Sequence, residues 1–364
     1  MKFGLISLGG TSSNRILDAA REYFDTCIPL DIRKIEIKTS SKECNVYYDG
    51  KVLKNFDCIY IRGSFRYVLL KKAIAELLKE QCYIPMKPES FTICNNKFNT
   101  LIALQKQKLP VPTTYYAPNV ETAKKILNLV NYPIIIKIPE GTQGKGVMFA
   151  DSLPSAKSVL DAMGAFKQPF LIQEYIETGA TDLRALVVGN KVVACMRRKA
   201  SSNDLRANIH RGGDGETYIL PPEIEDIAVK SAKAAGIDIC GVDILEGNKI
   251  AVIEINTSPG LKGIMKYTGV KVDKMIAKYL YQQTKKFVKN KKNDDYQSIL
   301  SSLEVVTPET NEIISNLNQV GNIVKMPSLI TKMAGFLNEQ EILYRVKKGK
   351  IEILPTHKEK NKEE

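Results

Sequence analysis

Two β-rich runs within Gly241 to Gly260, "GVDILEGNKIAVIEINTSPG", meet at Gly247-Asn248, a favourable two-residue hairpin turn. Closing the hairpin at this turn predicts that Asp243 lies opposite Val252. Residues two apart along a strand share a face of the sheet, and so do cross-strand partners. The polar side chains that this register gathers on one side of a sheet are those of Asp243, Glu254 and Asn256.

These three side chains offer only oxygen ligands among apolar neighbours. Glu254 and Asn256 are expected roughly 6–7 Å apart along their strand, with Asp243 diagonally across. Oxygen ligands without histidine or thiolate suit Mg²⁺ or Mn²⁺. The sequence therefore predicts a metal site, and the alternative is a solvated sheet face with ordinary surface acids.

The glycine-rich stretch "EGTQGKGV", Glu140 to Val147, fits neither a Walker A loop nor the dinucleotide fingerprint. It is flanked by the β-branched and apolar runs "YPIIIKI" and "GVMFA", so we expect it to join two strands. Such a hairpin tip lets the backbone approach a polyphosphate closely and act as a lid, with Lys137 as a fixed positive charge beneath it. The alternative is a surface turn with an incidental lysine.

A second hairpin, "ATDLRALVVGNKVVACMRRKA", turns at Gly189-Asn190 and predicts that Asp182 pairs with Arg197, with Arg184 on the same face. Downstream, "NDLRANIHRGG" offers several hydrogen-bond donors, among them Arg206 and Asn208. This set of donors suits an anionic oxygen of a triphosphate, an acyl phosphate or a substrate carboxylate. The alternative is an arginine-rich surface loop.

Charge and cysteine usage limit the partners and the compartment. The formal net charge of +13 favours anionic partners such as a nucleotide, a polycarboxylate or ribosomal RNA, and the alternative is a basic surface with charged linkers. Seven scattered cysteines without a C-x-x-C pair, and the lack of a bilayer-length apolar run, predict a cytoplasmic protein without membrane association.

The chain of 364 residues has room for several domains. Alternating strands and helices predict a doubly wound α/β domain over residues 1–87, whose first helix, "SSNRILDAAREYF", is capped by Ser12 or Ser13. The main body is expected over residues 88–288 and ends on the helix that begins near Val272. Beyond it we expect a polar linker at 289–296, a β-rich module at 297–355 with a hairpin over Lys348-Gly349, and a disordered tail at 356–364.

In combination, seven motifs resemble the RimK-type ATP-grasp carboxylate–amine ligases. They are "NNKFNT", "IIIKIPEGTQGKGV", "QEYI", "TDLRALVVGNKVVACMRR", "LRANIHRGG", "GVDIL" and "IEINTSPGLKGI", in the order and at the spacings of that family. The resemblance covers roughly Phe3 to Lys285. It implies an ATP-grasp fold of the α/β and α+β class, in which a pre-ATP-grasp domain precedes two lobes that hold ATP between them.

The resemblance also implies roles for individual residues. Lys97 and Lys137 would contact the ATP phosphates beneath the lid hairpin of residues 134–150, and Glu174 with Tyr175 would form the adenine hinge. The complete implied nucleotide-binding set is Lys97, Lys137, Gly141, Gly144, Gly146, Glu174, Tyr175, Asp182, Arg206, Ala207 and Asn208. Arg206 and Lys137 would be the catalytic residues. Asp243, Glu254 and Asn256 match the family's metal ligands, which would bind two Mg²⁺ or Mn²⁺ ions.

The implied reaction joins a carboxylate to an amine through an acyl phosphate. The expected partners are ATP, an amino acid with glutamate foremost, and an acceptor that is a protein C-terminus or a polyglutamylated cofactor. Two alternatives stay open: a ligase acting on a carrier protein in lysine or arginine biosynthesis, and a nucleotide-sensing regulator.

The chain departs from the family pattern after Lys285. The segment "GNIVKMPSLITKMAGFLNEQEILYRVKKGKIEIL" faintly resembles the swapped-hairpin barrel of AbrB-like DNA-binding proteins, although "NEQ" replaces the usual Gly-Asp. We expect an oligomerisation or partner-docking module and therefore a homo-oligomer, with DNA binding as the alternative.

Overall fold

In the computed structural model of the protein, the described residues are 1–140, 146–165, 168–199, 214–302, 318–320, 323–326, 330–331, 334 and 341–355. The chain divides into two compact units, Met1–Asp294 and Asp295–Glu364. None of the helices in the described ranges has the length and apolar character needed to cross a membrane.

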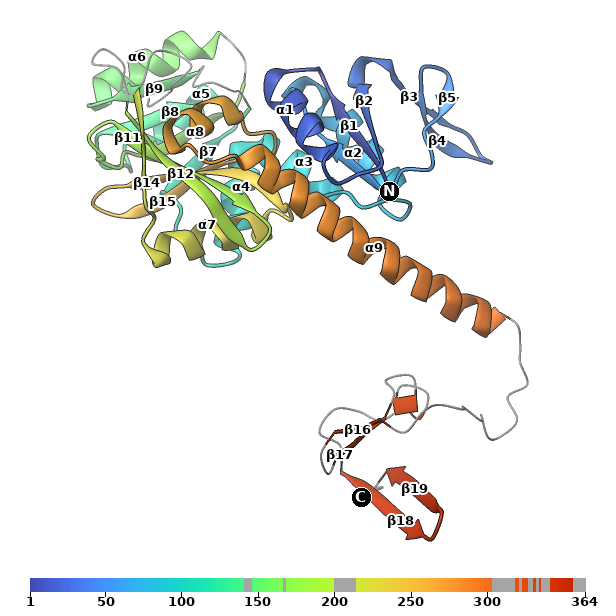
Figure 1. Cartoon of the computed structure of the whole chain (residues 1–364). Coiled ribbons are helices and arrows are strands. Elements are labelled where there is room, and N and C mark those ends of the chain that lie inside the picture. Colours follow the sequence, from blue (N-terminus) through green and yellow to red (C-terminus); the bar gives the residue numbers. More distant parts are fainter. Residues whose placement is uncertain are drawn as a thin grey trace, which may run out of the picture. The chain divides into compact units, whose positions relative to one another are not determined.

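The first unit begins with a parallel sheet of strand order β2-β1-β6. Figure 1 shows its strands β1 and β2. Its elements are β1 (Lys2–Ser7), α1 (Thr11–Ala20), β2 (Thr26–Asp31), β6 (Cys58–Ile61) and α2 (Val68–Leu78). Apart from its first residue, β1 is buried throughout, as is usual for a parallel strand covered on both faces. Beside this sheet lie the 3-10 helices η1 (Ile32–Lys34) and η2 (Phe65–Tyr67), and the antiparallel strands β3 (Ile35–Thr39), β4 (Cys44–Tyr48) and β5 (Lys51–Val52).

The predicted cap of α1 is wrong, because Gly10 is the N-cap residue and neither serine caps the helix. The two serine hydroxyls accept hydrogen bonds from more distant parts of the chain. Ser12 Oγ accepts from the backbone N–H of Leu261 at 2.9 Å, and Ser13 Oγ accepts from Arg62 Nε at 3.2 Å. Tertiary contacts therefore use these hydroxyls in place of the local capping role.

Two helices follow the first sheet, α3 (Pro88–Asn95) and α4 (Lys97–Gln105). Asn96 caps α4, since its Oδ1 accepts from the N–H groups of Phe98 and Asn99 at 3.0 and 3.2 Å. The N–H of Lys97 donates to Pro139 O at 3.0 Å. This bond fixes the start of α4 against the chain that leaves strand β8 (Ile134–Lys137).

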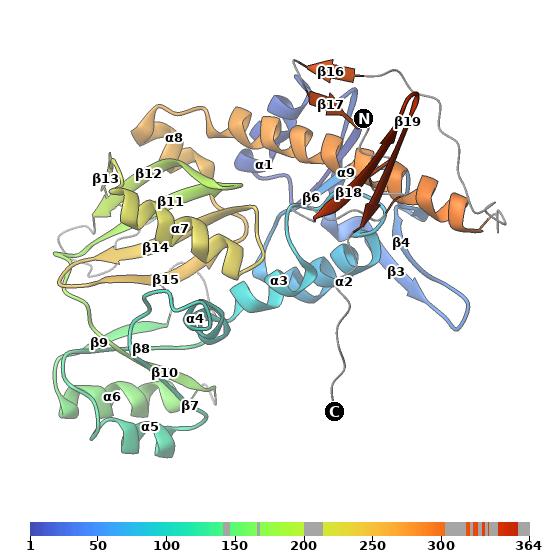
Figure 2. The ribbon, with the colours of Figure 1, turned by 90° about the horizontal axis from the view of Figure 1, so that it is seen from below.

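An antiparallel sheet of order β7-β10-β8-β9 forms the next layer. It contains β7 (Thr114–Ala117), β8 (Ile134–Lys137), β9 (Val147–Ala150) and β10 (Phe170–Glu174), and helices α5 (Val120–Ile126) and α6 (Leu153–Gly164) cover one face (Figure 2). Lys137 pairs with Val147, so the glycine-rich stretch does join two antiparallel strands, as predicted.

A five-stranded antiparallel sheet of order β13-β12-β11-β14-β15 completes the main body. Its strands are β11 (Thr181–Val188), β12 (Lys191–Lys199), β13 (Asp214–Thr217), β14 (Ile239–Glu246) and β15 (Ile250–Asn256). Helix α7 (Pro222–Ala234) packs on this sheet, and α8 (Leu261–Thr268) lies against β12 and β13 (Figure 2). Apolar side chains of the sheet and of α7 are buried between them.

Helix α9 (Val272–Ser302) follows, and Val272, Ile276 and Leu280 form the buried stripe that its sequence predicts. Residues 289–296 were expected to form a polar linker without regular structure. That prediction is wrong, because these residues continue the helix. Lysine is a good helix former, so a helix held by its packed first turns continues through them. The boundary between the two units, at Asp294 and Asp295, falls within the same range.

The second unit contains two strand pairs in its described residues. β16 (Asn318–Val320) pairs with β17 (Ile323–Lys325), and β18 (Ile342–Lys347) pairs with β19 (Lys350–Pro355). The hairpin predicted over Lys348-Gly349 is confirmed. The tail predicted at 356–364 lies outside the described residues.

Candidate functional site

Six charged or amide side chains lie on one face of the five-stranded sheet. Cross-strand pairing connects them in a row, because Arg198 lies opposite Asp182, Arg184 opposite Asp243, and Asp243 opposite Glu254. We refer to this set as the polar face; its members are Asp182, Arg184, Arg198, Asp243, Glu254 and Asn256. The predicted grouping of Asp243, Glu254 and Asn256 on one side of the sheet is therefore confirmed as geometry.

The register that leads to this grouping differs from the prediction. The turn between β14 and β15 has three residues, so Glu246 pairs with Ile250, and Asp243 does not lie opposite Val252. A Cβ on Gly247 would lie 1.9 Å from Glu177 O, a close approach that requires glycine there. A β-bulge at Ile253 then shifts the pairing by one residue. The bulge turns Glu254 to the side of Asp243 and leaves Val252 fully buried opposite Ile244.

A second bulge makes the register of the β11–β12 hairpin differ from the predicted one. Val188 pairs with Lys191 across the predicted two-residue turn, but the register shifts after Leu186, so Asp182 pairs with Arg198 and not with Arg197. Arg197 contacts other groups: its Nη2 lies 3.1 Å from Glu246 Oε2, and its guanidinium lies over the Tyr218 ring. The predicted partner of Asp182 was therefore wrong by one residue, while Arg184 does share its face.

Two arginines hold the aspartates of the polar face. Arg198 donates to Asp182 at 2.5 and 2.8 Å and to Asp243 Oδ2 at 2.9 Å, and Arg184 donates to both oxygens of Asp243 at 2.7 and 2.5 Å. Burial opposes the ionisation of Asp243, but the two guanidinium groups outweigh it and keep its pKa below the usual value. Burial raises the pKa of Asp182 to about 6 against the attraction of Arg198.

Glu254 differs from the two aspartates because it forms no ion pair with any described residue. Burial, followed by the negative charge of Asp243, raises its pKa. With the Asn256 amide in the orientation that satisfies both of its ends, Nδ2 donates to Glu254 Oε1 at 3.1 Å and Oδ1 accepts from Arg184 Nη2 at 3.2 Å. Glu254 is thus a partly buried carboxylate whose ionised form a cation would stabilise.

Two lysines approach the same region from other elements. Lys137, at the end of β8, is only 6% exposed and donates to Gln173 Oε1 at 2.7 Å. Burial, with a smaller effect of the Lys97 charge, lowers the pKa of Lys137 to about 8. Burial also lowers the pKa of Lys97, while Glu254 acts in the opposite direction on both lysines. Lys97, Lys137 and Glu254 are therefore close enough to influence one another electrostatically.

Glu174 and Tyr175, the predicted hinge residues, lie where β10 ends. Glu174 accepts from the N–H of Thr113 and from Lys249 Nζ, both at 2.5 Å. The second contact connects the four-stranded sheet to the β14–β15 turn. Tyr175 packs edge-on against Phe149 of β9 at 5.2 Å between ring centroids. The glutamate side chain is thus engaged in structural contacts, which leaves the backbone as the part of the hinge that would contact adenine.

Several predicted residues lie outside the described part of the chain. These are Gly141, Gly144, Arg206, Ala207 and Asn208. Gly146, the last glycine of the predicted lid, is described and has φ of +73°, a conformation that favours glycine. A Cβ at this position would lie 3.0 Å from the Ile138 side chain.

The oxygen donors Asp243, Glu254 and Asn256 fit a hard divalent cation, since Glu254 is partly buried and has no ionic partner among the described residues. No group of three His, Cys, Asp or Glu side chains suited to a metal occurs in the described ranges, so the third ligand would have to be Asn256. Arg184 and Arg198 already occupy both oxygens of Asp243. A cation would share this carboxylate with the arginines or displace one of them.

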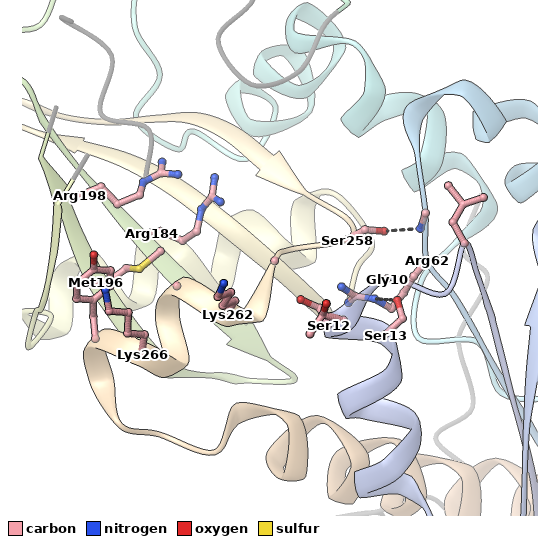
Figure 3. A pocket seen from close by; sticks show the side chains of 16 residues that line it. Gly10, Ser12, Ser13, Arg62, Arg184, Met196, Arg198, Ser258, Lys262 and Lys266 are labelled. Atoms are coloured by element: carbon pink, nitrogen blue, oxygen red, sulfur yellow. Dashed lines mark hydrogen bonds between the residues drawn. The ribbon is translucent and has the colours of Figure 1, made fainter. Parts of the chain in front are cut away.

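A cavity of about 750 Å³, which the motifs did not predict, lies beside the polar face (Figure 3). Its walls are formed by the polar-face arginines, the loop before α1, the end of β6 and the start of α8. The only signal in the sequence is the spacing of Lys262 and Lys266, which puts both on one side of a short helix.

Comparisons with known proteins agree with this geometry. The model of the RimK-like ATP-grasp domain matches residues 94–280. A probable alpha-L-glutamate ligase of Thioalkalivibrio sulfidiphilus is 34% identical over 292 residues, and one of Methanococcoides burtonii is 32% identical over 291; each match covers 78% of this chain and 97% of the relative. Among solved structures, the ATP-grasp ligase PsnB in complex with minimal precursor, Mg and ADP matches with a TM-score of 0.61 and 18% identity, covering 78% of this chain and 98% of that one.

Proposed function

Because the chain belongs to the RimK-like ATP-grasp family of ligases, we propose that it adds L-glutamate to the carboxylate of an acceptor, either a protein C-terminus or a polyglutamylated cofactor. The enzyme class and the ATP-grasp fold expected from the sequence are both confirmed. The identity of the amino acid, the acceptor and the roles of single residues are proposals.

In the proposed reaction an oxygen of the acceptor carboxylate attacks the γ-phosphorus of ATP, and ADP leaves with the electrons of the broken P–O bond. The neutral amine of glutamate then attacks the acyl phosphate. Inorganic phosphate leaves, the amine loses one proton, and a peptide or isopeptide bond remains. The reaction needs no oxidant, reductant or further co-reactant.

We assign the phosphate contacts to Lys97 and Lys137, whose positive charges lie near Glu254. Asp243, Glu254 and Asn256 would hold Mg²⁺, which when bound offsets negative charge on the phosphates. Arg184 and Arg198 would orient the reacting carboxylate, because both line the adjoining cavity. Arg206 and Asn208, outside the described residues, remain predicted contacts of the γ-phosphate.

One observation carries the proposal: Glu254, a partly buried carboxylate without an ion pair to any described residue, acts electrostatically on two lysines that come from a different sheet and a helix. A metal-bound triphosphate between them would neutralise all three groups.

The test is ATP-dependent phosphate release with glutamate and a panel of acceptors, namely peptides with free C-termini, γ-glutamyl oligomers and a carrier protein with a C-terminal glutamate. We expect turnover only when glutamate and one acceptor class are both present. If the carrier protein is the only acceptor in the panel that supports turnover, the result would favour the carrier-protein ligase. ATP binding without turnover by any acceptor would favour a nucleotide sensor.

A further inference from the structure

The cavity beside the polar face contains an excess of positive charge. Five cationic side chains line it, and no Asp or Glu of the described residues does. The five are Arg62, Arg184, Arg198, Lys262 and Lys266. Arg184 and Arg198 are paired with aspartates of the polar face, but the other three have no carboxylate partner among the described residues.

Arg62 is buried, with 3% of its surface exposed, and its hydrogen bonds to the described residues go to neutral groups. Its guanidinium donates to Ser13 Oγ at 3.2 Å, Tyr60 OH at 3.1 Å and Pro259 O at 2.8 Å. These bonds position the side chain between α1, β6 and the start of α8 (Figure 3). No described carboxylate pairs with this charge, so an anion in the cavity would stabilise it.

Lys262 and Lys266 lie one turn apart on α8 and are both exposed. The helix packs through Leu261 and Ile264, so these lysines are not needed for its burial. Like charges at this spacing destabilise a helix slightly, and neither lysine has an ion pair within the described chain. Both line the cavity, with Lys262 also close to the α1 end (Figure 3). An anion bound between the two charges would relieve this repulsion.

We propose that the cavity binds the carboxyl-donating acceptor and that Lys262 and Lys266, together with Arg62, bind a second carboxylate of the same molecule. The reacting carboxylate would lie at the Arg184 and Arg198 end, next to Asp243. Lys262 and Lys266 are then specificity-determining residues that select acceptors with at least two carboxylates. The inference rests on the proposed ligase function and extends it to a substrate class.

The experiment compares two peptides, Ala-Ala-Glu-Glu and Ala-Ala-Gln-Gln, which have equal length and each end in a free α-carboxylate. The test variant is Lys262→Glu/Lys266→Glu. The matched control is Lys271→Glu/Lys278→Glu, which changes the net charge equally at two exposed positions outside the cavity lining. Thermal unfolding of both variants is measured to establish that each is folded.

The wild-type enzyme should prefer the glutamate peptide at least about tenfold in kcat/KM, and the control variant should keep that preference. The cavity variant should lose it, while the KM for ATP and the kcat/KM for the glutamine peptide change less than about threefold. A cavity variant that keeps the wild-type preference would overturn the proposal.

Binding separates failure of this inference from failure of the proposed function. Each peptide, labelled with fluorescein at its N-terminus, is titrated by fluorescence anisotropy with Mg²⁺ and a non-hydrolysable ATP analogue present. If neither peptide is turned over, tighter binding of the glutamate peptide that is lost in the cavity variant still supports the subsite. Equal binding of both peptides by the wild type contradicts it, whether or not turnover occurs.

Discussion

Glu254 is a carboxylate whose burial and whose neighbour Asp243 both oppose ionisation. Glu254→Gln keeps the size of the side chain but removes the charge that a cation needs. We expect kcat/KM to fall at least about 100-fold, and the thermal midpoint to stay the same or rise because a disfavoured charge is removed. Glu216→Gln, at an exposed position of the same sheet, is the control. Near-normal turnover of Glu254→Gln at limiting Mg²⁺ would exclude this metal site.

The lowered pKa of Lys137 predicts that kcat/KM for ATP depends on pH. Burial lowers its pKa to about 8, so the free enzyme loses this positive charge as the pH rises through that value. The kcat/KM for ATP should therefore decline above about pH 8, and Lys137→Ala should lose about 10²- to 10³-fold in kcat/KM and show no such decline. The exposed Lys125→Ala is the control. An unchanged alkaline decline in Lys137→Ala would assign it to another group.

The lowered pKa of Lys137 also has a consequence for stability. A lysine with a depressed folded-state pKa destabilises the fold below that pKa, and the cost is relieved as the pH rises toward the unfolded-state pKa. Urea titrations should therefore show a smaller stability difference between wild type and Lys137→Met at pH 10 than at pH 7. Equal differences at both pH values would mean that the charge is already compensated in the folded protein.

Much of the candidate site could be predicted from the residue types that its sequence motifs contain. Asp243, Glu254 and Asn256 could be grouped from alternation along one strand and pairing with another. Arg198 could not be identified as the partner of Asp182, because a one-residue bulge far from both decides the pairing. Arg62 could not be connected to the site at all, since its contacts reach Ser13 and Pro259 from distant parts of the chain.

At the scale of elements, the β8–β9 hairpin is the feature to test as a lid. Gly146→Ala puts a Cβ on a residue with φ of +73° and against Ile138, while Gly50→Ala does the same at φ of +76° with nothing within 4 Å. Each should cost about 1–2 kcal/mol of stability through the backbone. Only Gly146→Ala should slow phosphate release.

Hydrogen exchange across residues 140–147 provides a second measurement of the lid. A non-hydrolysable ATP analogue with Mg²⁺ should protect these amides in the wild type and less so in Gly146→Ala. If no protection develops and Gly146→Ala is as active as Gly50→Ala, the stretch is an ordinary surface turn.

Strand identities and hairpin partners were predictable from β-branched runs and turn residues, whereas the two bulges were not. At Ile253 the sequence shows no glycine or proline that would mark an irregularity. The bulge arises because Glu254 has to face Asp243 while Val252 is buried with Ile244. Tertiary burial determines it, so a rule based on local sequence misses it.

At the scale of the whole molecule, a chain ending at Asp294 should fold and keep kcat/KM with peptide acceptors within about threefold, since the division into units falls there. A chain ending at Ala277 should not fold, because it lacks Leu280 and Thr284, which are both fully buried. Loss of turnover by a folded 1–294 chain would mean that the second unit contributes to the site.

The order of elements in the first unit was predictable because each has its own periodicity. The course of α9 beyond its packed turns was not, since a polar run reads equally as a linker or as an exposed helix. The role of the second unit, expected to support oligomerisation or docking, stays a prediction. Its described hairpin exposes Val346 and Ile351, which does not identify a partner.

The most direct measurement is the fate of oxygen during turnover. The peptide Ala-Ala-Glu-Glu is labelled with ¹⁸O in all of its carboxylates and incubated with ATP, Mg²⁺ and glutamate, and the released phosphate is analysed by mass spectrometry. An acyl-phosphate mechanism predicts one ¹⁸O in each phosphate and one in the new peptide bond. Product formation with unlabelled phosphate, or with the label in AMP, would contradict the proposed reaction.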